Sequence, residues 1–230
     1  MKKIAILQSN YIPWKGYFDL ISKVDEFVIY DDVQFTKNDW RNRNKIKTPK
    51  GLEWITIPVG QNIKRKINDV IITSKWQKKH WKTLQTNYSK AFFFKEISEW
   101  LEPLYLKKEY KYLSEVNIVF IKEICRYLKI NTKIENSSNY KQINGQTENL
   151  VNICTQSNAK EYISGPSAKN YINENLFNEK NIKLKWINYD NYKKYDQLWG
   201  DFVHNVSIVD LLFNLGSKAK NYINNSIKLD

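Results

Sequence analysis

The chain has 230 residues, and its 37 lysine and arginine residues outnumber its 24 acidic residues to give a formal net charge of +13. This length suffices for one large domain or two small ones, with a core that needs no disulfide or metal to hold it. The two cysteines, Cys125 and Cys154, exclude a disulfide framework, lack the spacing of a zinc site and suit a reducing compartment.

No run of about 18 apolar residues occurs, so the sequence predicts no membrane span. The apolar run Ile4 to Leu7 ends at Gln8 and is too short for a signal peptide, so we expect a cytoplasmic protein. The basic charge favours anionic partners, including nucleotides and nucleic acid. Because the lysines are spread along the whole chain rather than gathered in one stripe, nucleic acid is the less favoured of the two.

The N-terminal part of the chain predicts a βαβ unit. Residues 3–8 have the composition of a strand, a turn-rich loop follows with Pro13 and Gly16, and a helix is expected from Tyr17 to Val24. The apolar run Phe27 to Tyr30 predicts the second strand. Since such units are parallel and right-handed, we expect an α/β fold with a Rossmann-like, mostly parallel sheet at the N-terminus and helices packed around it.

In such a unit, the loops after the two strands open on the same edge of the sheet, where α/β proteins bind ligands. The second strand leads directly into two adjacent carboxylates, Asp31 and Asp32. The following stretch carries recognition groups rather than the Gly, Ser and Pro of a plain surface loop. The candidates at this edge are Gln8, Tyr11 and Tyr17 from the first loop and Gln34, Lys37, Trp40, Asn42, Arg43 and Asn44 from the second. The alternative interpretation is a solvated turn with scattered charge.

The alternating stretch Trp54–Val59 predicts a third strand. Trp76 to Tyr88 then predicts a helix whose inward face carries Trp76, His80 and Tyr88 at multiples of four residues. That position gives His80 two evenly weighted interpretations. It is either a structural imidazole bonded to a carbonyl group or a catalytic base, because imidazole titrates near neutral pH.

Helices are further expected at Phe92–Leu106, closing near Pro103, and at Leu113–Leu128, Thr147–Ser157 and Ser207–Leu215, with strands at Asn131–Ile134 and Lys183–Ile187. The polar stretch 137–147 predicts a linker. It would separate an N-terminal α/β portion, 1–136, which carries the site, from a C-terminal α/β portion, 147–230, packed on it. A single domain is the alternative.

A strand from Glu161 leads into the small residues Ser164 and Gly165. We expect this turn to open a helix from Ala168 to Leu176 and to form an anion site, to which Lys169 adds charge. The alternative is an ordinary strand-to-helix turn.

Sequence blocks along nearly the whole chain carry a family resemblance. They are Gln-x-x-Tyr-x-Pro-x-x-Gly-Tyr at 8–17, Phe-Val-Ile-Tyr-Asp-Asp-Val-Gln-Phe-x-Lys at 27–37 and Trp-x-Asn-Arg-Asn-x-Ile at 40–46, followed by Lys79-His-Trp-Lys82, Ser164-Gly-Pro and Ser207-Ile-Val-Asp-Leu-Leu-Phe-Asn214. In these blocks the chain resembles the WbqC-like protein family, and it departs from the pattern at Ser9, where proline is expected. The resemblance implies a role in bacterial surface-polysaccharide biosynthesis, including O-antigen and lipopolysaccharide, in clusters that make amino-deoxy sugars.

With this resemblance, the first hypothesis is a transferase that places an acyl or aminoacyl group on the amine of a nucleotide-linked amino-deoxy sugar. The amine must lose a proton before it attacks, and the candidate bases are His80, Asp31 and Asp32. The two acids would alternatively share a magnesium ion. Acyl-CoA, an amino acid activated with ATP and magnesium, and aminoacyl-tRNA all stay open as donors.

In this hypothesis Arg43, Lys37 and Lys169 hold the phosphates, whereas Trp40 and Tyr11 stack on the sugar or the base. The second hypothesis is a non-catalytic protein that binds a nucleotide sugar or nucleic acid through basic and aromatic side chains.

Overall fold

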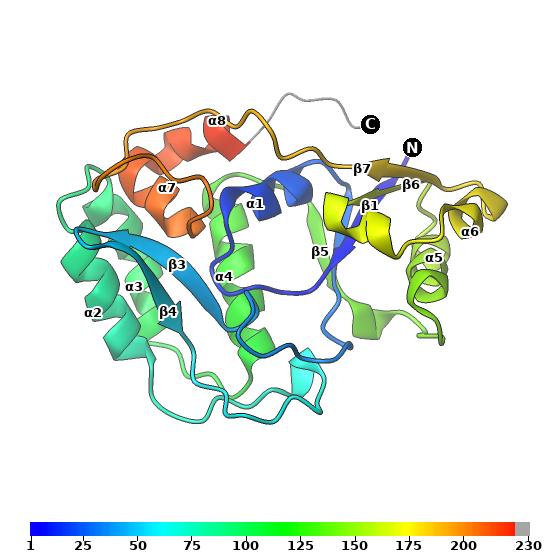
Figure 1. Ribbon diagram of the computed structural model, residues 1–230, viewed down its shortest axis with the longest axis horizontal. Helices are drawn as coiled ribbons and strands as arrows, with labels where there is room; N and C mark the ends of the chain where they lie inside the picture. Colours follow the sequence, from blue (N-terminus) through cyan, green and yellow to red (C-terminus); the bar gives the residue numbers. More distant parts are fainter. Residues whose placement is uncertain (224–230) are drawn as a thin grey trace.

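The computed structural model describes residues 1–223, and its centre is a parallel sheet of five strands in the order β5-β2-β1-β6-β7. The strands are β1 (Lys3–Leu7), β2 (Glu26–Ile29), β5 (Lys133–Asn136), β6 (Glu161–Ser164) and β7 (Lys183–Trp186). β1 pairs in parallel with β2 on one side and with β6 on the other. The predicted α/β class, with a mostly parallel sheet and packed helices, is confirmed (Figure 1).

Helices cover both faces of the sheet, because successive side chains of a strand point to opposite faces. Ala5 and Phe27 belong to a large apolar cluster on one face, whereas Ile4, Ile6 and Val28 belong to a smaller cluster on the other. The helices of the large cluster include α1 (Lys15–Ser22) and α4 (Leu113–Tyr127), and those of the small one are α5 (Gln146–Gln156) and α6 (Glu174–Glu179). Strands β1 and β2 are apolar on both faces, and each face is buried under one of the two clusters.

A long insertion between β2 and β5 extends the large cluster. It comprises the hairpin of β3 (Arg43–Thr48) and β4 (Gly51–Thr56), the 3-10 helix η1 (Ile67–Asp69), and α2 (Gln77–Tyr88), α3 (Phe94–Leu106) and α4. The strand expected at Trp54–Val59 is present as β4, but it begins at Gly51, ends at Thr56 and lies in this separate antiparallel hairpin. The helix end expected near Pro103 is wrong, because α3 continues through Pro103 to Leu106.

The prediction of a helix from Ala168 to Leu176 is also wrong. Pro166–Asn170 form a short 3-10 helix, η3, and α6 begins only at Glu174, where the side chain of Asn173 caps it. The turn at Ser164 and Gly165 therefore does not lead into the N-terminus of an α-helix, on which the predicted anion site depended. The chain then continues through β7 to α7 (Ile208–Leu215), η4 (Gly216–Ala219) and α8 (Lys220–Ile223), and η2 (Ser137–Asn139) follows β5.

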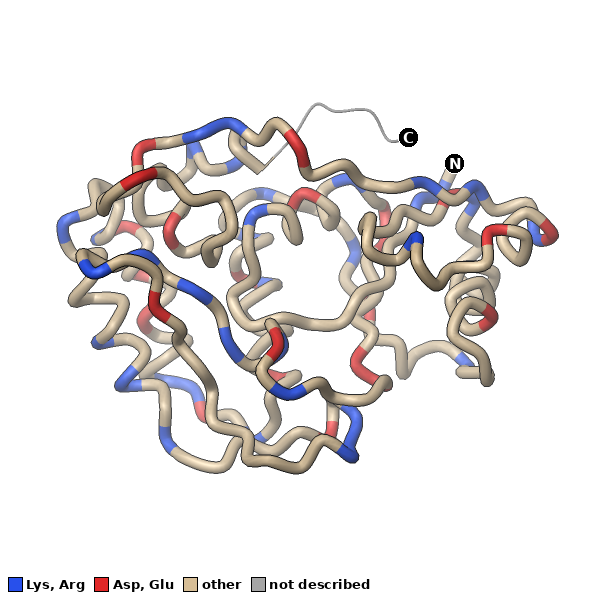
Figure 2. The backbone as a smooth tube through the Cα atoms, viewed as in Figure 1, with Lys and Arg blue, Asp and Glu red and all other residues tan. Residues whose placement is uncertain are grey.

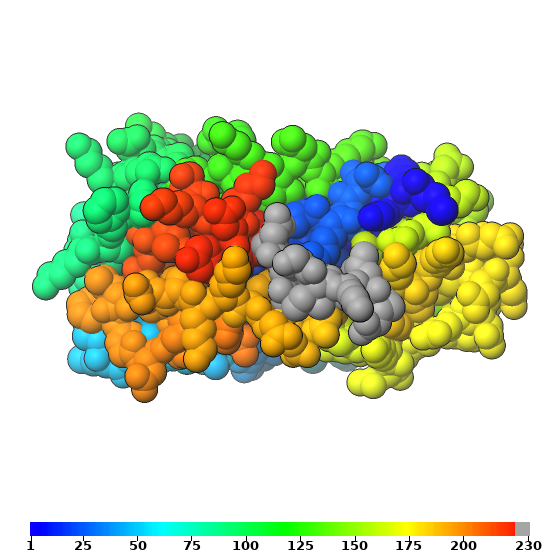
Figure 3. Space-filling model, turned by 90° about the horizontal axis from the view of Figure 1, so that it is seen from above, coloured from blue at the N-terminus to red at the C-terminus, as the bar shows by residue number. Residues whose placement is uncertain are grey.

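Segment 187–206, between β7 and α7, lies along the surface between the C-terminal helices and the β3–β4 hairpin (Figure 3, orange). It is tied down by polar contacts rather than by regular structure. Lys47 Nζ donates to Gln197 Oε1 at 3.0 Å, and Trp199 Nε1 donates to the carbonyl of Asn87 at 2.8 Å. Buried Asp210 accepts a hydrogen bond from the Tyr195 hydroxyl at 2.7 Å. These contacts fix the distant C-terminal residues beside the hairpin.

The order of the strands reverses at β1, because the chain first builds outward through β2 and β5 and then returns to place β6 on the other side of β1. In open α/β sheets, ligands bind outside the carboxyl ends of the strands at such a switch point. Strands from both expected portions, 1–136 and 147–230, share this sheet. Within residues 1–223, no helix combines the length and the apolar composition that crossing a membrane requires.

Candidate functional site

The ends of β1 and β2 lie side by side, as the βαβ unit predicts. The backbone N–H of Ser9 donates to Asp31 Oδ1 at 2.8 Å, and the Ser9 hydroxyl donates to Oδ2 at 2.7 Å. The Ser114 hydroxyl of α4 also donates to Oδ2. Asp31 is 4% exposed. Burial raises the pKa of its carboxyl, and the hydrogen bonds from Ser114 and Ser9 oppose that shift. Asp31 thus joins the first loop to α4.

Asp32 has partners of its own. It accepts hydrogen bonds from Asn68 Nδ2 at 2.9 Å and from the Ser137 hydroxyl at 2.5 Å. The described part of the chain contains no group of three or more His, Cys, Asp and Glu side chains that could hold a metal. Because the two carboxylates share no hydrogen-bond partner and their oxygen atoms accept from neutral donors, this donor set does not fit a shared magnesium ion.

His80 lies on the inner face of α2, behind the first loop. Its Nε2 lies 3.1 Å from the carbonyl oxygen of Thr56, which can only accept, so Nε2 carries the proton. Nδ1 then accepts from the Tyr11 hydroxyl at 2.9 Å, and that hydroxyl lies 2.8 Å from the hydroxyl of Tyr105. His80 is 4% exposed, and a base must contact the amine that it deprotonates. Its role as a base stays a prediction that requires the first loop to move.

We expect the buried imidazole to make stability depend on pH. Burial lowers the pKa of His80 from 6.5 to about 4, with the hydrogen bond to Thr56 opposing and the charge of Lys79 adding to the shift. Between pH 6.5 and pH 4, the imidazole is protonated in the unfolded chain but not in the folded protein. The free energy of unfolding is therefore highest above pH 6.5 and falls as the pH decreases towards 4. The loss reaches about 3 kcal/mol.

Urea unfolding of the wild type and of the His80→Gln variant at several pH values checks this. The wild type should lose more stability than the variant on acidification, because the other buried groups are common to both. Parallel pH profiles would show that His80 is readily protonated in the folded protein.

The first loop, residues 8–14, is clamped by groups from distant segments. Asn44 Nδ2 donates to the carbonyls of Tyr11 at 3.1 Å and Ile12 at 2.9 Å, and the Ser207 hydroxyl donates to Ile12 at 2.7 Å. Ile12 has φ +36°, a region that a β-branched residue rarely adopts. Such strain persists only where the surroundings over-determine the backbone, and it is concentrated at functional sites.

This clamp shapes a cavity of about 220 Å³, lined by Asn10, Pro13, Trp14, Trp40, Asn44 and Asn205. We call it the Trp14–Trp40 pocket. Its lining combines two indoles with three side-chain amides and contains no charged group. It is smaller than the roughly 300–1,000 Å³ of pockets for drug-sized ligands, so its size suits a single ring. Flat apolar walls with a few amide groups are suited to stacking on a ring and hydrogen bonding to its substituents.

An exposed cationic and aromatic surface adjoins the pocket at Trp40. The ring of Trp40, which is 39% exposed, lies 5.2 Å from that of Trp54 on β4. The guanidinium carbon of Arg43 lies 4.2 Å and Lys45 Nζ 5.0 Å from the centre of the Trp54 ring. Cations on an indole face attract anionic groups while the exposed indole edges remain available for contact.

The remaining predicted residues take different positions. Buried Asn42 donates to the carbonyl of Ile57, and Tyr17 donates to the carbonyl of Gln8, so these residues support the two loops. Lys169 Nζ lies over the ring of Trp186 on β7. Gln34 and Lys37 are exposed on the second loop, Ser164 is buried at the end of β6, and Gly165 beside it is partly exposed.

Four polar or aromatic residues of this region were missed by the sequence analysis. Asn10, Trp14 and Asn205 line the pocket, and Arg41 lies beside it with Nη1 2.5 Å from Asn10 Oδ1. Trp14 is held by Gly16, because a Cβ atom at position 16 would lie 2.3 Å from its indole. An aromatic residue next to the Pro13 turn was a signal for Trp14, whereas no local signal links Asn205 to a loop almost 200 residues away.

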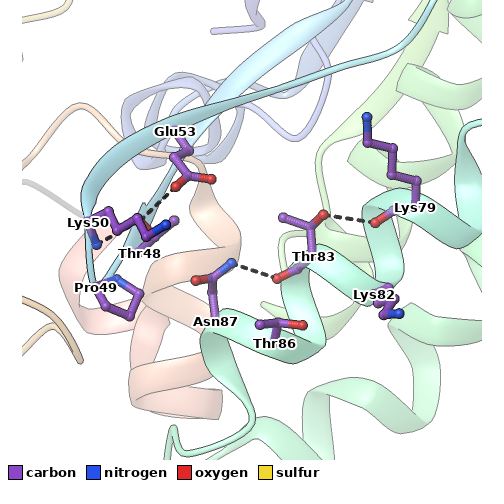
Figure 4. Close-up of a pocket in the computed structure, with 9 residues that line it drawn as sticks. All are labelled: Thr48, Pro49, Lys50, Glu53, Lys79, Lys82, Thr83, Thr86 and Asn87. Atoms are coloured by element: carbon purple, nitrogen blue, oxygen red, sulfur yellow. Dashed lines mark hydrogen bonds between the residues drawn. The ribbon is translucent and has the colours of Figure 1, made fainter.

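A second, shallower cavity of about 490 Å³ lies between α2 and the tip of the β3–β4 hairpin (Figure 4). Its lining includes Lys50, Lys79, Lys82 and one acid, Glu53. We call it the lysine groove. Two of its polar side chains bond within α2, since the Thr83 hydroxyl donates to the carbonyl of Lys79 and the Asn87 amide donates to that of Thr83. Lysines and arginines occur all around the molecule, as the sequence predicts, and the groove is one local concentration of them (Figure 2).

Comparison with known proteins places this chain in a family. The model of the WbqC-like protein family matches residues 8–222. The chain belongs to the WbqC-like protein family. It is also 52% identical over 226 residues to the uncharacterized protein Rv1507c of Mycobacterium tuberculosis, and the match covers 97% of this chain and 98% of that protein. No solved structure matches the chain significantly.

Two sequence blocks that carry the WbqC-like resemblance meet in space at the Trp14–Trp40 pocket. The block 8–17 supplies Asn10, Pro13 and Trp14, and the block 40–46 supplies Trp40 and Asn44. Two of the blocks that carry the resemblance thus converge on one cavity near the switch point of the sheet, whereas the block 27–37 does not line it.

Proposed function

We propose that this WbqC-like protein is a transferase of bacterial surface-polysaccharide biosynthesis that places an acyl or aminoacyl group on the amine of a nucleotide-linked amino-deoxy sugar. The observation that carries the proposal is the Trp14–Trp40 pocket, which is lined by two tryptophans and three asparagines in a volume suited to one ring. The amide of Asn44 is already bonded to the first loop and to Lys45, so Asn10 and Asn205 are the amides nearest to a ligand. The family resemblance supports the class of substrate.

In this arrangement the pocket binds the sugar ring, and the surface formed by Trp54, Arg43 and Lys45 lies on the exposed side of Trp40. The chain's contribution to the reaction would be positioning. A ring held between the indoles presents its amine in a fixed direction to an activated acyl donor. This orientation lowers the entropy cost of bringing the two reactants together in the transition state. All three donor classes carry phosphate groups, and the lysine groove is a basic surface between α2 and the tip of the hairpin.

Removing either indole is expected to weaken the binding of a nucleotide sugar by about tenfold or more, because stacking residues at the centre of a site dominate its affinity. The measurement is calorimetric titration of wild type, Trp14→Ala and Trp40→Ala with UDP-N-acetylglucosamine and a dTDP-linked 4-amino sugar. Trp100→Ala is the matched control, because Trp100 stacks on Tyr127 between α3 and α4 and does not line the pocket.

Turnover is tested by incubating the protein and the nucleotide-linked amino sugar with one donor at a time. The donors are acetyl-CoA, amino acids with ATP and magnesium, and aminoacyl-tRNA, and the mass of the product is measured by mass spectrometry. An increase of one acyl mass that Trp14→Ala abolishes supports the transferase. Equal sugar binding in all three tryptophan variants would refute the pocket as its acceptor site.

The second candidate function is a non-catalytic nucleic-acid binder, and the lysine groove is the observation that favours it. α2 has three exposed lysines, Lys78, Lys79 and Lys82, and no acidic residue. Binding of tRNA that falls steeply with salt and requires Lys79 and Lys82, together with no binding of nucleotide sugars, would favour this function over the transferase.

A further inference from the structure

Arg41 lies near the switch point of the sheet, where the order of the strands reverses. Its Nη1 donates to Asn10 in the loop after β1. Its positive charge also acts on Tyr171, which follows η3 after β6: burial raises the pKa of Tyr171, and Arg41 opposes the shift. The loops after β1 and β6 are the two that border the switch point, so the guanidinium is bonded to one of these loops and its charge acts on the other.

The backbone of this residue is fixed from two sides. The carbonyl of Arg41 accepts a hydrogen bond from Asn117 Nδ2 of α4 at 2.9 Å, and the carbonyl of Trp40 accepts one from the N–H of Tyr11 at 3.0 Å. The side chain is 15% exposed. The guanidinium is therefore held in place before any ligand arrives, which reduces the entropy cost of binding.

Most of the donors of this guanidinium are unused. A guanidinium has five N–H donors, and within residues 1–223 the hydrogen bond to Asn10 is its single one. Its Nε is buried and has no hydrogen-bond partner among the described residues. A buried donor without an acceptor costs free energy, so this arrangement favours a ligand that supplies acceptor oxygens.

The acidic groups facing Arg41 do not supply those oxygens. Asp39 Oδ2 lies 3.7 Å from Nη2, beyond hydrogen-bond distance, and its two oxygens already accept from the Thr36 hydroxyl and the N–H of Trp40. Asp31 interacts with Arg41 only through its charge, and its oxygens are taken by Ser9 and Ser114. A guanidinium with free donors is the group that binds phosphate in a bidentate manner.

We infer that Arg41 binds the diphosphate of the ligand at the β1–β6 switch point, an inference that rests on the proposed function for the position of the sugar. Asn10 links the two sites, because it lines the Trp14–Trp40 pocket and accepts the hydrogen bond from Arg41. The ligand would run from a sugar ring between the indoles to a diphosphate on the guanidinium. Arg41, rather than the predicted Arg43, Lys37 and Lys169, is then the principal phosphate-binding residue.

Calorimetric titration with inorganic pyrophosphate and with UDP tests the inference. The wild type should bind both, and Arg41→Gln should weaken both by about tenfold or more, since a charge-assisted bidentate contact is lost. Arg41→Lys keeps the charge without the fork and should bind with intermediate affinity. Arg126→Gln is the matched control, because it removes one arginine from the exposed surface of α4, where Arg126 pairs with Glu123.

Unchanged pyrophosphate affinity in both Arg41 variants, or no binding of pyrophosphate and UDP by the wild type, would overturn the inference. If Arg41→Gln does not fold, the comparison of Arg41→Lys with the wild type decides. The proposed function fails separately: loss of UDP binding in Arg41→Gln together with full sugar binding in Trp14→Ala would retain the phosphate site and reject the acceptor pocket.

Discussion

Replacing Asp31 with alanine is expected to lower the free energy of unfolding by about 3 kcal/mol, because a buried acceptor is removed while its donors stay behind. The Ser9 N–H, the Ser9 hydroxyl and the Ser114 hydroxyl all lose their partner. Since these groups join the first loop to α4, the same change should also weaken nucleotide-sugar binding at the adjacent pocket. The measurements are urea unfolding and calorimetric titration of the purified variant.

Asp32→Ala is the matched control. Asp32 follows Asp31 directly but is less deeply buried and accepts one hydrogen bond each from Asn68 and Ser137. Its loss should cost about 1 kcal/mol, the typical value for a partly exposed hydrogen bond. The opposite outcome for Asp31, a variant as stable as the wild type that binds the sugar but turns nothing over, would identify this carboxylate as the predicted base instead of a positioning group.

Gly16→Ala is expected to disrupt the Trp14–Trp40 pocket while leaving the rest of the fold in place. A Cβ at this position would lie 2.3 Å from one indole atom of Trp14 and 2.6 Å from another, so the ring must leave its site. Overpacking of this kind costs about 1–3 kcal/mol. Gly16 is in the first turn of α1, where alanine is intrinsically the better helix former by about 1 kcal/mol, so a net loss of stability can only come from the clash. We expect nucleotide-sugar affinity to fall by about tenfold or more.

The double variant Gly16→Ala with Trp14→Leu separates the two effects of the clash. Leucine leaves room for the new methyl group, so stability should recover relative to Gly16→Ala, whereas the binding of the sugar should not, because one indole wall is still missing. Recovery of binding in the double variant would show that Trp14 makes no contact with the ligand. Calorimetry and urea unfolding on the four proteins of this cycle provide the measurements.

Local patterns were sufficient to predict the central sheet. The apolar runs at Ile4 and Phe27, with a helix between them, fix β1 and β2 as parallel neighbours, and the four-residue spacing of Trp76, His80 and Tyr88 fixes α2. β3 was missed because Arg43–Thr48 is mostly polar. Asn44, Ile46 and Thr48 are buried on one face of it, and its pairing with β4 and the contacts of the C-terminal segment stabilise it as a strand.

The meeting of the two loops was predicted, and the lining of the pocket was predicted only in part. The two loop exits meet, and Trp40 and Asn44 line the pocket. Asn205 was not predictable, because the hydrogen bonds of segment 187–206 that place it are made with residues far away in sequence, such as Lys47 and Asn87. Arg41 and Arg43 cannot be ranked from sequence either. Only the fold shows that one faces the switch point and the other lies on Trp54.

The position of a bound nucleotide sugar tests the central claim most directly. A crystal structure of the protein with UDP-N-acetylglucosamine should show the sugar ring between the indoles of Trp14 and Trp40 and the diphosphate within hydrogen-bond distance of the Arg41 guanidinium. Density for the ligand in the lysine groove between α2 and the hairpin, with the Trp14–Trp40 pocket filled only by water, would contradict the claim.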